Sequence, residues 1–192
     1  MIRLTSTLAA ALLLGAGAAT TGCATPGTRP GDMSVAGHEA AATNGDAAVG
    51  AKHRAAAQAL RDAEAQACAG MAERDRDLSA FFRREDIESF SALYEPSGRT
   101  GTALRGSVLV MRPAPGVTPE WLQRNIECHI ARSAALGHGL EQMSKCPFAL
   151  NGASVEARSG GDKFLVYVRG SDPATAAEIW RRTQTLRPVA VN

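Results

Sequence analysis

Cysteine and histidine side chains gather in one stretch of this chain, together with a methionine. Cys128 and His129 are neighbours, and His138, Met143 and Cys146 follow them. Thiolate, imidazole and thioether groups are ligands that suit Cu(I) and Zn(II). A thiol within hydrogen-bond reach of an imidazole is also the pair that nucleophilic catalysis by cysteine requires.

The spacing of these residues restricts both kinds of chemistry. Neighbouring residues of a helix point about 100° apart, so Cys128 and His129 do not form a thiol–imidazole pair with each other. The set Cys128, His129, His138 and Cys146 matches no established spacing of metal ligands. We therefore favour structural roles for these side chains and expect no cofactor. The alternative is a metal-binding or thiol-active module built around Cys128, His129 and Cys146, with His138 as a further metal ligand.

The rest of the sequence offers no catalytic pattern. It contains no nucleophile elbow, phosphate-binding loop, zinc-protease motif or dinucleotide-binding fingerprint. Acidic residues between positions 75 and 88 alternate with arginines, a mixed-sign pattern that is typical of solvated surface. The sequence therefore predicts no catalytic residue and a protein that is not an enzyme.

The cysteines also bear on the fold. The chain has four, at positions 23, 68, 128 and 146. If Cys23 is modified, the other three leave one cysteine over in an oxidising compartment. Three pairings are open, and we favour Cys128–Cys146 because it closes the shortest loop. On the chain-entropy model such a disulfide would stabilise the fold by about 3 kcal/mol.

The N-terminal segment has the features of an export signal. Met1–Arg3 supply a short positive start, and Leu4–Gly22 contain no charge. The densest apolar run, Leu8–Leu14, fits a secretory core of roughly 7–15 residues and falls short of the roughly 20 that a membrane-spanning helix needs. We predict a signal peptide over residues 1–22.

The end of this segment resembles the lipobox of bacterial lipoproteins. Thr20-Thr21-Gly22-Cys23 places a small residue directly before a cysteine, although Thr20 departs from the usual large aliphatic residue. The resemblance implies that the Cys23 thiol receives a diacylglycerol, that the chain is cut before it, and that the new amine is acylated. Several acyl chains give stable anchoring, since each buried CH₂ contributes about 0.8 kcal/mol.

Thr20 leaves a second cleavage site open. Ala16-Gly17-Ala18 is a site of the ordinary secretory kind, and cleavage there would give a soluble secreted or periplasmic protein. With the lipobox, Ala24 after the cysteine resembles the outer-membrane default of Gram-negative lipoproteins. We therefore expect a lipid-anchored protein of the cell envelope, at the outer membrane and facing the periplasm, with the soluble protein as the alternative.

Residues 23–50 predict a lipidated flexible tether. The segment is rich in Gly, Pro, Ala, Thr and Asp, with no aromatic residue and no apolar periodicity. Such a composition buries too little apolar surface to offset the entropy of ordering. His38 and Glu39 then belong to the solvated tether, and residues 51–192 remain as a single domain of ordinary size.

Periodicity and turn residues predict the elements that carry the cysteines and histidines. Thr118-Pro119 and Asp172-Pro173 mark helix starts. We expect an α+β two-layer sandwich, in which an N-terminal helix precedes ββα–ββα, with an antiparallel sheet of about four strands and helices on one face. The predicted helices are 51–77, 118–136 and 173–186, and the predicted strands are 87–94, 102–112, 153–158 and 163–169.

The charge balance bears on partners. The chain carries 21 Lys+Arg against 19 Asp+Glu, with no basic block interleaved with aromatics, so we expect no nucleic-acid partner. The expected partners are the membrane, through the lipid anchor, and an envelope protein or a small ligand. The sequence thus predicts an exported envelope lipoprotein whose domain is a non-catalytic binding or structural module.

Overall fold

The computed structural model describes residues 33–76, 84–138, 143 and 145–186. The predicted signal peptide and Cys23 lie outside the described residues, so both stay predictions. Within the described ranges, no helix combines the length and the apolar character that crossing a membrane requires.

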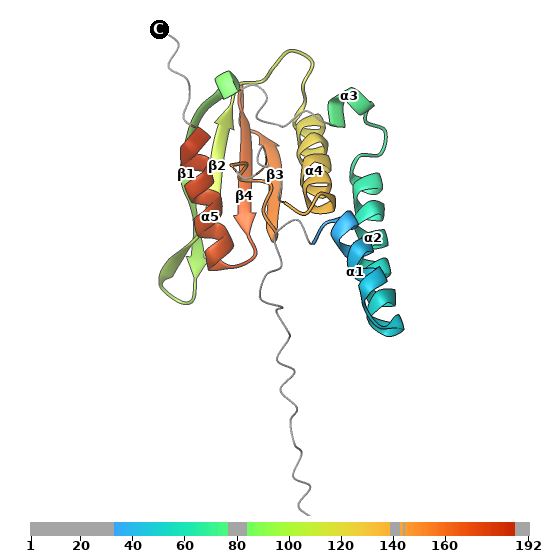
Figure 1. Ribbon diagram of the computed structural model, residues 1–192. Helices are drawn as coiled ribbons and strands as arrows, with labels where there is room; N and C mark the ends of the chain where they lie inside the picture. Colours follow the sequence, from blue (N-terminus) through green and yellow to red (C-terminus); the bar gives the residue numbers. More distant parts are fainter. Residues whose placement is uncertain (1–32, 77–83, 139–142, 144, 187–192) are drawn as a thin grey trace, which may run out of the picture.

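A four-stranded sheet forms one layer of the molecule. Strands β1 (Ile87–Ser97) and β2 (Gly101–Met111) form one hairpin, and β3 (Ala153–Ser159) and β4 (Phe164–Gly170) form another. The strand order is β1-β2-β4-β3, and all neighbours are antiparallel. β1 and β3 are therefore the edge strands of the sheet (Figure 1).

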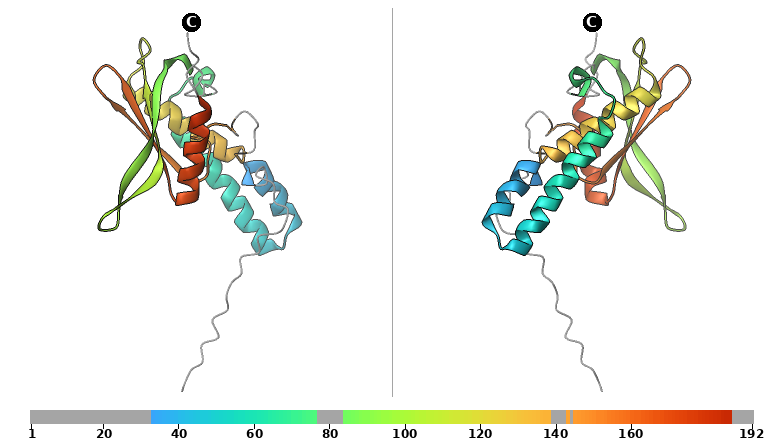
Figure 2. Two further views of the ribbon diagram at one scale, coloured as in Figure 1. Left: turned by 90° about the vertical axis from the view of Figure 1, so that its left-hand side faces the viewer. Right: turned by 90° about the vertical axis from the view of Figure 1, so that its right-hand side faces the viewer.

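Each hairpin is followed by a helix that packs on the sheet. α4 (Pro119–Ala135) and α5 (Pro173–Thr183) both begin with proline, and the side chains of Thr118 and Asp172 accept hydrogen bonds from amides of the first turn. Figure 2 shows the sheet on one side of the molecule and the helices gathered on the other. The predicted α+β sandwich, with the order ββα–ββα, is confirmed.

A helical hairpin precedes the sandwich. α1 (Val35–Asn44) and α2 (Ala47–Ala67) pack against each other, and α2 also packs on α4 (Figure 1). Ser34 caps α1 and Asp46 caps α2, each accepting hydrogen bonds from backbone amides of the following turn. The hairpin thus joins the sandwich through α2.

The prediction of a tether over residues 23–50 is wrong from α1 onward. Alanine is the best helix former, so this alanine-rich segment is helical once both helix starts are capped. α1 packs mainly on one neighbour and needs no broad apolar stripe, which is why periodicity missed it. His38 is only 8% exposed, and its Nδ1 lies 3.0 Å from Nδ1 of His53 on α2. Glu39, also predicted to be solvated tether, pairs with Arg61.

The core lies between the sheet and the two helices that cover it. Alternate residues of β2 and β4, such as Leu109 and Val166, point toward the helices and are fully buried. They meet Ile126 of α4, Ile179 of α5 and Phe148 of the loop before β3. Short helical turns complete the described chain, namely α3 (Glu73–Arg76) and two 3-10 turns, Arg84–Asp86 and Gln184–Leu186.

The sheet face away from the helices carries ion pairs. Glu95 of β1 contacts Arg169 of β4 at 2.8 Å, and Glu156 of β3 lies 3.3 Å from the same guanidinium group. Arg158 and Arg169 also flank the ring of Tyr167, with guanidinium carbons 5.4 and 5.2 Å from its centroid. These charges are already paired with one another, as is usual for a solvated sheet face.

Candidate functional site

The structure pairs Cys128 with Cys68. Their sulfur atoms form a disulfide bond, and both side chains are buried. Cys68 ends α2 and Cys128 lies in the middle of α4, so the bond ties the helical hairpin to the sandwich. The predicted Cys128–Cys146 bond is therefore wrong, and Cys146 is the free cysteine among the described residues.

The Cys128–Cys146 pairing was predicted because it closes the shortest loop, and this criterion was misleading. Cys128 sits on the side of α4 that faces α2, whereas the next residue, His129, points toward the loop that holds Cys146. Loop length changes the entropy of closure only slowly, so helix-face geometry outweighs it. Predicting this pairing would have required knowing that α2 packs on α4.

Cys146 and His129 form a buried thiol–imidazole contact. Cys146 Sγ lies 3.4 Å from His129 Nε2, and the two residues are 8% and 7% exposed. His129 comes from α4 and Cys146 from the loop before β3. The alternative prediction of a metal-binding or thiol-active module includes both residues, and the structure brings them together.

The environment of this pair opposes thiolate chemistry. Burial lowers the pKa of His129, and the charge of Arg132 lowers it further. Burial raises the pKa of the Cys146 thiol, against a smaller opposing effect from the amides of Phe148 and Ala149 and from Arg182. Both effects favour the neutral forms, so the contact joins a neutral thiol and a neutral imidazole. Such a thiol is a poor nucleophile and a poor metal ligand.

Arg182 of α5 holds the loop that carries Cys146. Its Nη1 group donates to the carbonyl oxygens of Met143, Cys146 and Ala149 at 3.3, 3.1 and 3.3 Å. Its Nε donates to Glu178 at 2.8 Å, which fixes the direction of the guanidinium group. This one side chain therefore positions the loop, a role that no sequence pattern predicts beyond a basic residue near a helix end.

The predicted metal ligands do not come together as a set. The sulfur of Cys128 is bonded to Cys68 and is not a thiolate. His138 has a left-handed backbone conformation with φ of 53°, and its Nδ1 is hydrogen-bonded to Ser133 Oγ at 3.0 Å. Over the described part of the chain, no group of three or more His, Cys, Asp or Glu side chains is arranged to hold a metal ion.

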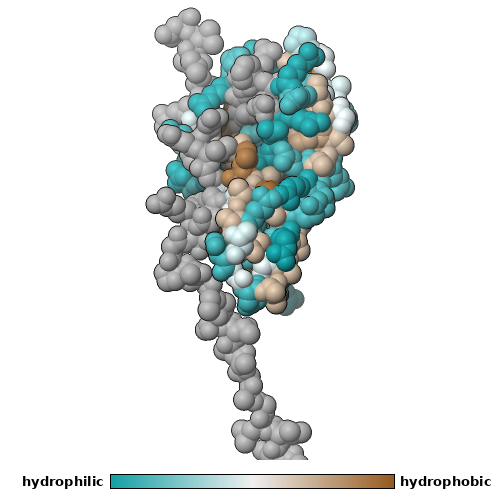
Figure 3. Space-filling view, turned by 45° about the vertical axis from the view of Figure 1, so that its right-hand side comes forward, coloured by the Kyte–Doolittle hydropathy of each residue, from teal (hydrophilic) through white to brown (hydrophobic). Residues whose placement is uncertain are grey.

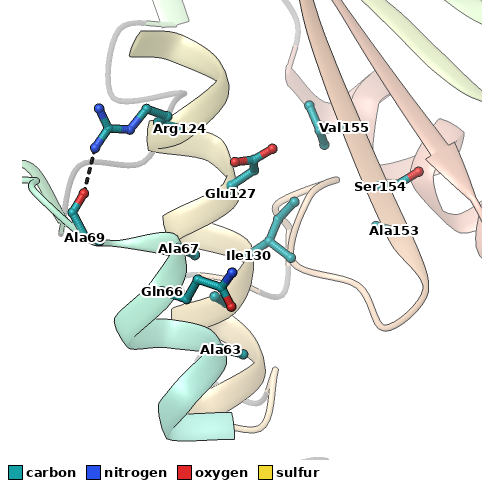
Figure 4. A pocket seen from close by; sticks show the side chains of 11 residues that line it. Ala63, Gln66, Ala67, Ala69, Arg124, Glu127, Ile130, Ala153, Ser154 and Val155 are labelled. Atoms are coloured by element: carbon teal, nitrogen blue, oxygen red, sulfur yellow. Dashed lines mark hydrogen bonds between the residues drawn. The ribbon is translucent and has the colours of Figure 1, made fainter. Parts of the chain in front are cut away.

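A groove lies elsewhere, where α2, α4 and the edge strand β3 meet. Its volume is about 760 Å³, within the range of about 300–1,000 Å³ that small ligands occupy in proteins. Figure 4 shows Glu127 and Ile130 of α4 facing Val155 of β3 across the opening. Its walls are lined by Ala63, Gln66, Ala67, Ala69, Arg124, Glu127, Ile130, Ala131, Ala153, Ser154 and Val155.

Gln123 of α4 is hydrogen-bonded to β3 next to this groove. Its side-chain amide donates to the Val155 carbonyl at 2.9 Å, and its oxygen accepts from the Ala157 amide at 2.6 Å. Glu127, one turn along α4, accepts a second hydrogen bond from Gln123 Nε2 at 2.6 Å and orients it. The primary amide thus occupies the position that a peptide group of a neighbouring strand would take.

The surface around the groove is mixed in character. Figure 3 shows that hydrophilic residues dominate this side of the molecule, with strongly apolar residues confined to a small area. The exposed large apolar side chains of the described chain are scattered, namely Met33, Val49, Tyr94, Trp121 and Leu136. The described residues on the side shown in Figure 3 therefore form no broad apolar docking face.

A second hollow of about 640 Å³ lies between the helical hairpin and the loop before β3. His38, His138 and Arg182 reach its wall, among mostly small apolar side chains. Their polar atoms have partners already, because His38 contacts His53, and Arg182 donates to backbone carbonyls. The groove at β3 therefore has the clearer capacity to bind.

The sequence missed the residues that shape this groove. Gln123 and Glu127 look like exposed positions of an amphipathic helix, and Ala63 and Ala67 look like a thin packing stripe. None of them belongs to a motif. Only the packing of α4 near the edge of β3 gives Gln123 its role.

Comparison of this chain with family models, curated proteins and solved structures finds no match. The domain resembles no named family, as the sequence predicted.

Proposed function

We propose that this chain is an exported bacterial envelope lipoprotein, anchored through Cys23, whose α+β domain is a non-catalytic binding module. The observation that carries the proposal is the buried Cys68–Cys128 disulfide. Structural disulfides form and persist in secreted and periplasmic proteins and are rare in the reducing cytosol. The bond therefore supports the export that the N-terminal sequence predicts.

The buried thiol supports a non-catalytic role. Cys146 is 8% exposed, and its only described side-chain partner is the neutral imidazole of His129. A catalytic cysteine needs a lowered pKa and access to substrate, and burial gives Cys146 the opposite of both. Binding through the groove at β3 is the activity that the described geometry supports best.

The anchor would keep the domain close to the membrane. Only residues 24–33 separate Cys23 from the cap of α1 at Ser34. A fully extended chain of that length spans at most about 40 Å. A binding module on such a short linker would meet its partners at or near the surface of the bilayer. Another protein of the envelope is a partner of that kind.

Intact mass spectrometry of the mature protein tests this proposal. The protein is purified from the membrane fraction of a Gram-negative host, and its mass is measured before and after reduction. We expect a chain that begins at Cys23 with acyl chains attached, and a gain of two hydrogens on reduction. A Cys23→Ser variant should leave the membrane fraction.

Two outcomes would overturn parts of this proposal. A mature chain that begins at Ala19 would support the soluble periplasmic protein in place of the anchored one. A chain that keeps its first 22 residues and has four free thiols would contradict export altogether.

A further inference from the structure

Two backbone groups of β3 have no partner in the groove among the described residues. Successive residues of a strand turn their backbone groups to opposite edges. Gln123 bonds Val155 and Ala157 from the free edge, so the odd-numbered residues of β3 present their N–H and C=O groups there. Among the hydrogen bonds of the described residues, none uses the Val155 N–H or the Ala153 C=O.

The charged side chains of the groove are, in contrast, already paired. Arg124 donates to the Ala69 carbonyl at 2.6 Å, and Glu127 accepts from Gln123 at 2.6 Å. A ligand would therefore find few free charges but a free backbone donor and acceptor on an edge strand. An extended backbone offers the matching donor and acceptor in this arrangement, as it does when a peptide adds a strand to a sheet edge.

The far wall of the groove, opposite β3, is formed by α2. α2 packs on α4 and turns the small side chains of Ala63 and Ala67 toward the opening opposite β3 (Figure 4). A second copy of the domain that paired edge to edge along β3 would have to share the groove with α2. A single extended segment is a smaller occupant, and the small wall residues would let its backbone approach closely.

We propose that this groove accepts an extended segment of an envelope partner protein, which pairs with Ala153 and Val155 of β3 as a short fifth strand. The Gln123 side chain marks the end of the pairing site, because it already occupies the next position along the edge. This inference rests on the proposed function, since it names the class of partner for the binding module.

A library of blocked hexapeptides built from alanine, serine, threonine and valine serves as the probe. The mature full-length protein in detergent is incubated with the library, and retained peptides are identified by mass spectrometry. The best-retained peptide is then titrated against variants by fluorescence anisotropy. A fully N-methylated copy of that peptide, which has no N–H to donate, should bind at least about tenfold more weakly if strand pairing holds the peptide.

Two bulky substitutions on α2 form a matched pair. Ala63→Trp fills the groove, whereas Ala65→Trp stands on the opposite face of α2, and both alanines are exposed in the free protein. We expect the first to weaken binding at least about tenfold and the second to leave it unchanged. Equal binding by both variants would overturn the proposal.

Val155→Pro removes the donor itself. Proline is tolerated on an edge strand where the lost N–H faced outward, so the β3–β4 ladder can persist. We expect about fivefold weaker binding, the effect of one hydrogen bond. In the unsubstituted protein, bound peptide should slow hydrogen exchange at the Val155 amide, and unchanged exchange there would contradict strand pairing.

These outcomes separate the inference from the proposed function. If the acylated protein retains no peptide, the result contradicts the proposed fifth strand but agrees with the lipid anchor. If a chain without acylation binds peptide at β3, the result contradicts the lipid anchor but agrees with the proposed fifth strand.

Discussion

Cys68 and Cys128 join two helices whose packing the sequence did not reveal, with their Cα atoms 4.7 Å apart. The bond lies where the helical hairpin meets the sandwich. On one side of it, Arg124 donates to the Ala69 carbonyl and Asn125 donates to the Asp75 carbonyl, so the segment after α2 is held to α4 at several points. The disulfide therefore ties α2, which forms one wall of the groove at β3, covalently to α4, which forms another.

Loss of this disulfide should destabilise the protein strongly. The two cysteines are 60 residues apart in sequence, and closing a loop of that length stabilises the fold by about 4 kcal/mol on the chain-entropy model. A Cys68→Ala, Cys128→Ala double variant should lose a stability of that order in urea unfolding. Reduced unsubstituted protein provides the control, because it lacks the bond but keeps both side chains. Equal stability of oxidised and reduced protein would contradict this role.

Removal of the Gln123 side chain should loosen the edge of β3. Gln123→Ala deletes two hydrogen bonds to the strand, which together contribute about 2 kcal/mol. We expect that loss in urea unfolding, and faster hydrogen exchange at the Ala157 amide. Gln123→Glu is the sharper comparison, because a carboxylate can accept from Ala157 but cannot donate to Val155. Unchanged exchange in both variants would show that the edge needs no side-chain partner.

Much of the sandwich could be predicted from the sequence because its signals are local. Thr118-Pro119 and Asp172-Pro173 marked the starts of α4 and α5, and the turn around Gly160 and Gly161 marked the β3–β4 hairpin. The helix α1 could not be predicted in the same way. Its stability comes from capping and from packing on α2, and neither leaves a periodic pattern in an alanine-rich segment.

The candidate site was less predictable, because it depends on contacts between distant residues. The thiol–imidazole contact joins His129 and Cys146, 17 residues apart, and helix geometry alone could suggest only that His129 needed a partner from elsewhere. Gln123 and Val155 are 32 residues apart and belong to no motif. Residue types constrain such contacts weakly, whereas the packing of α4 near the edge of β3 determines them.

Arg182 should control access to Cys146. Arg182→Met removes the donor to three loop carbonyls, so the loop should open more often and expose the thiol. We expect Cys146 to react faster with a thiol reagent under native conditions. Arg181→Met is the matched control, because Arg181 also pairs with Glu178 but makes no described contact with the loop. Equal reaction rates for the two variants would contradict a role for Arg182 in holding the loop.

The stability of the protein should fall in mild acid. Burial lowers the pKa of His129 and of His138 below the ordinary value of 6.5 in the folded state, so the unfolded chain binds more protons in that range. The stability that depends on neutral imidazoles is therefore complete above about pH 6.5 and is lost as the pH falls toward the lowered values. Urea unfolding at pH 7.5, 6.5 and 5.5 measures this loss. His129→Gln should flatten the dependence, because glutamine does not titrate, and an unchanged slope in that variant would place the acid sensitivity elsewhere.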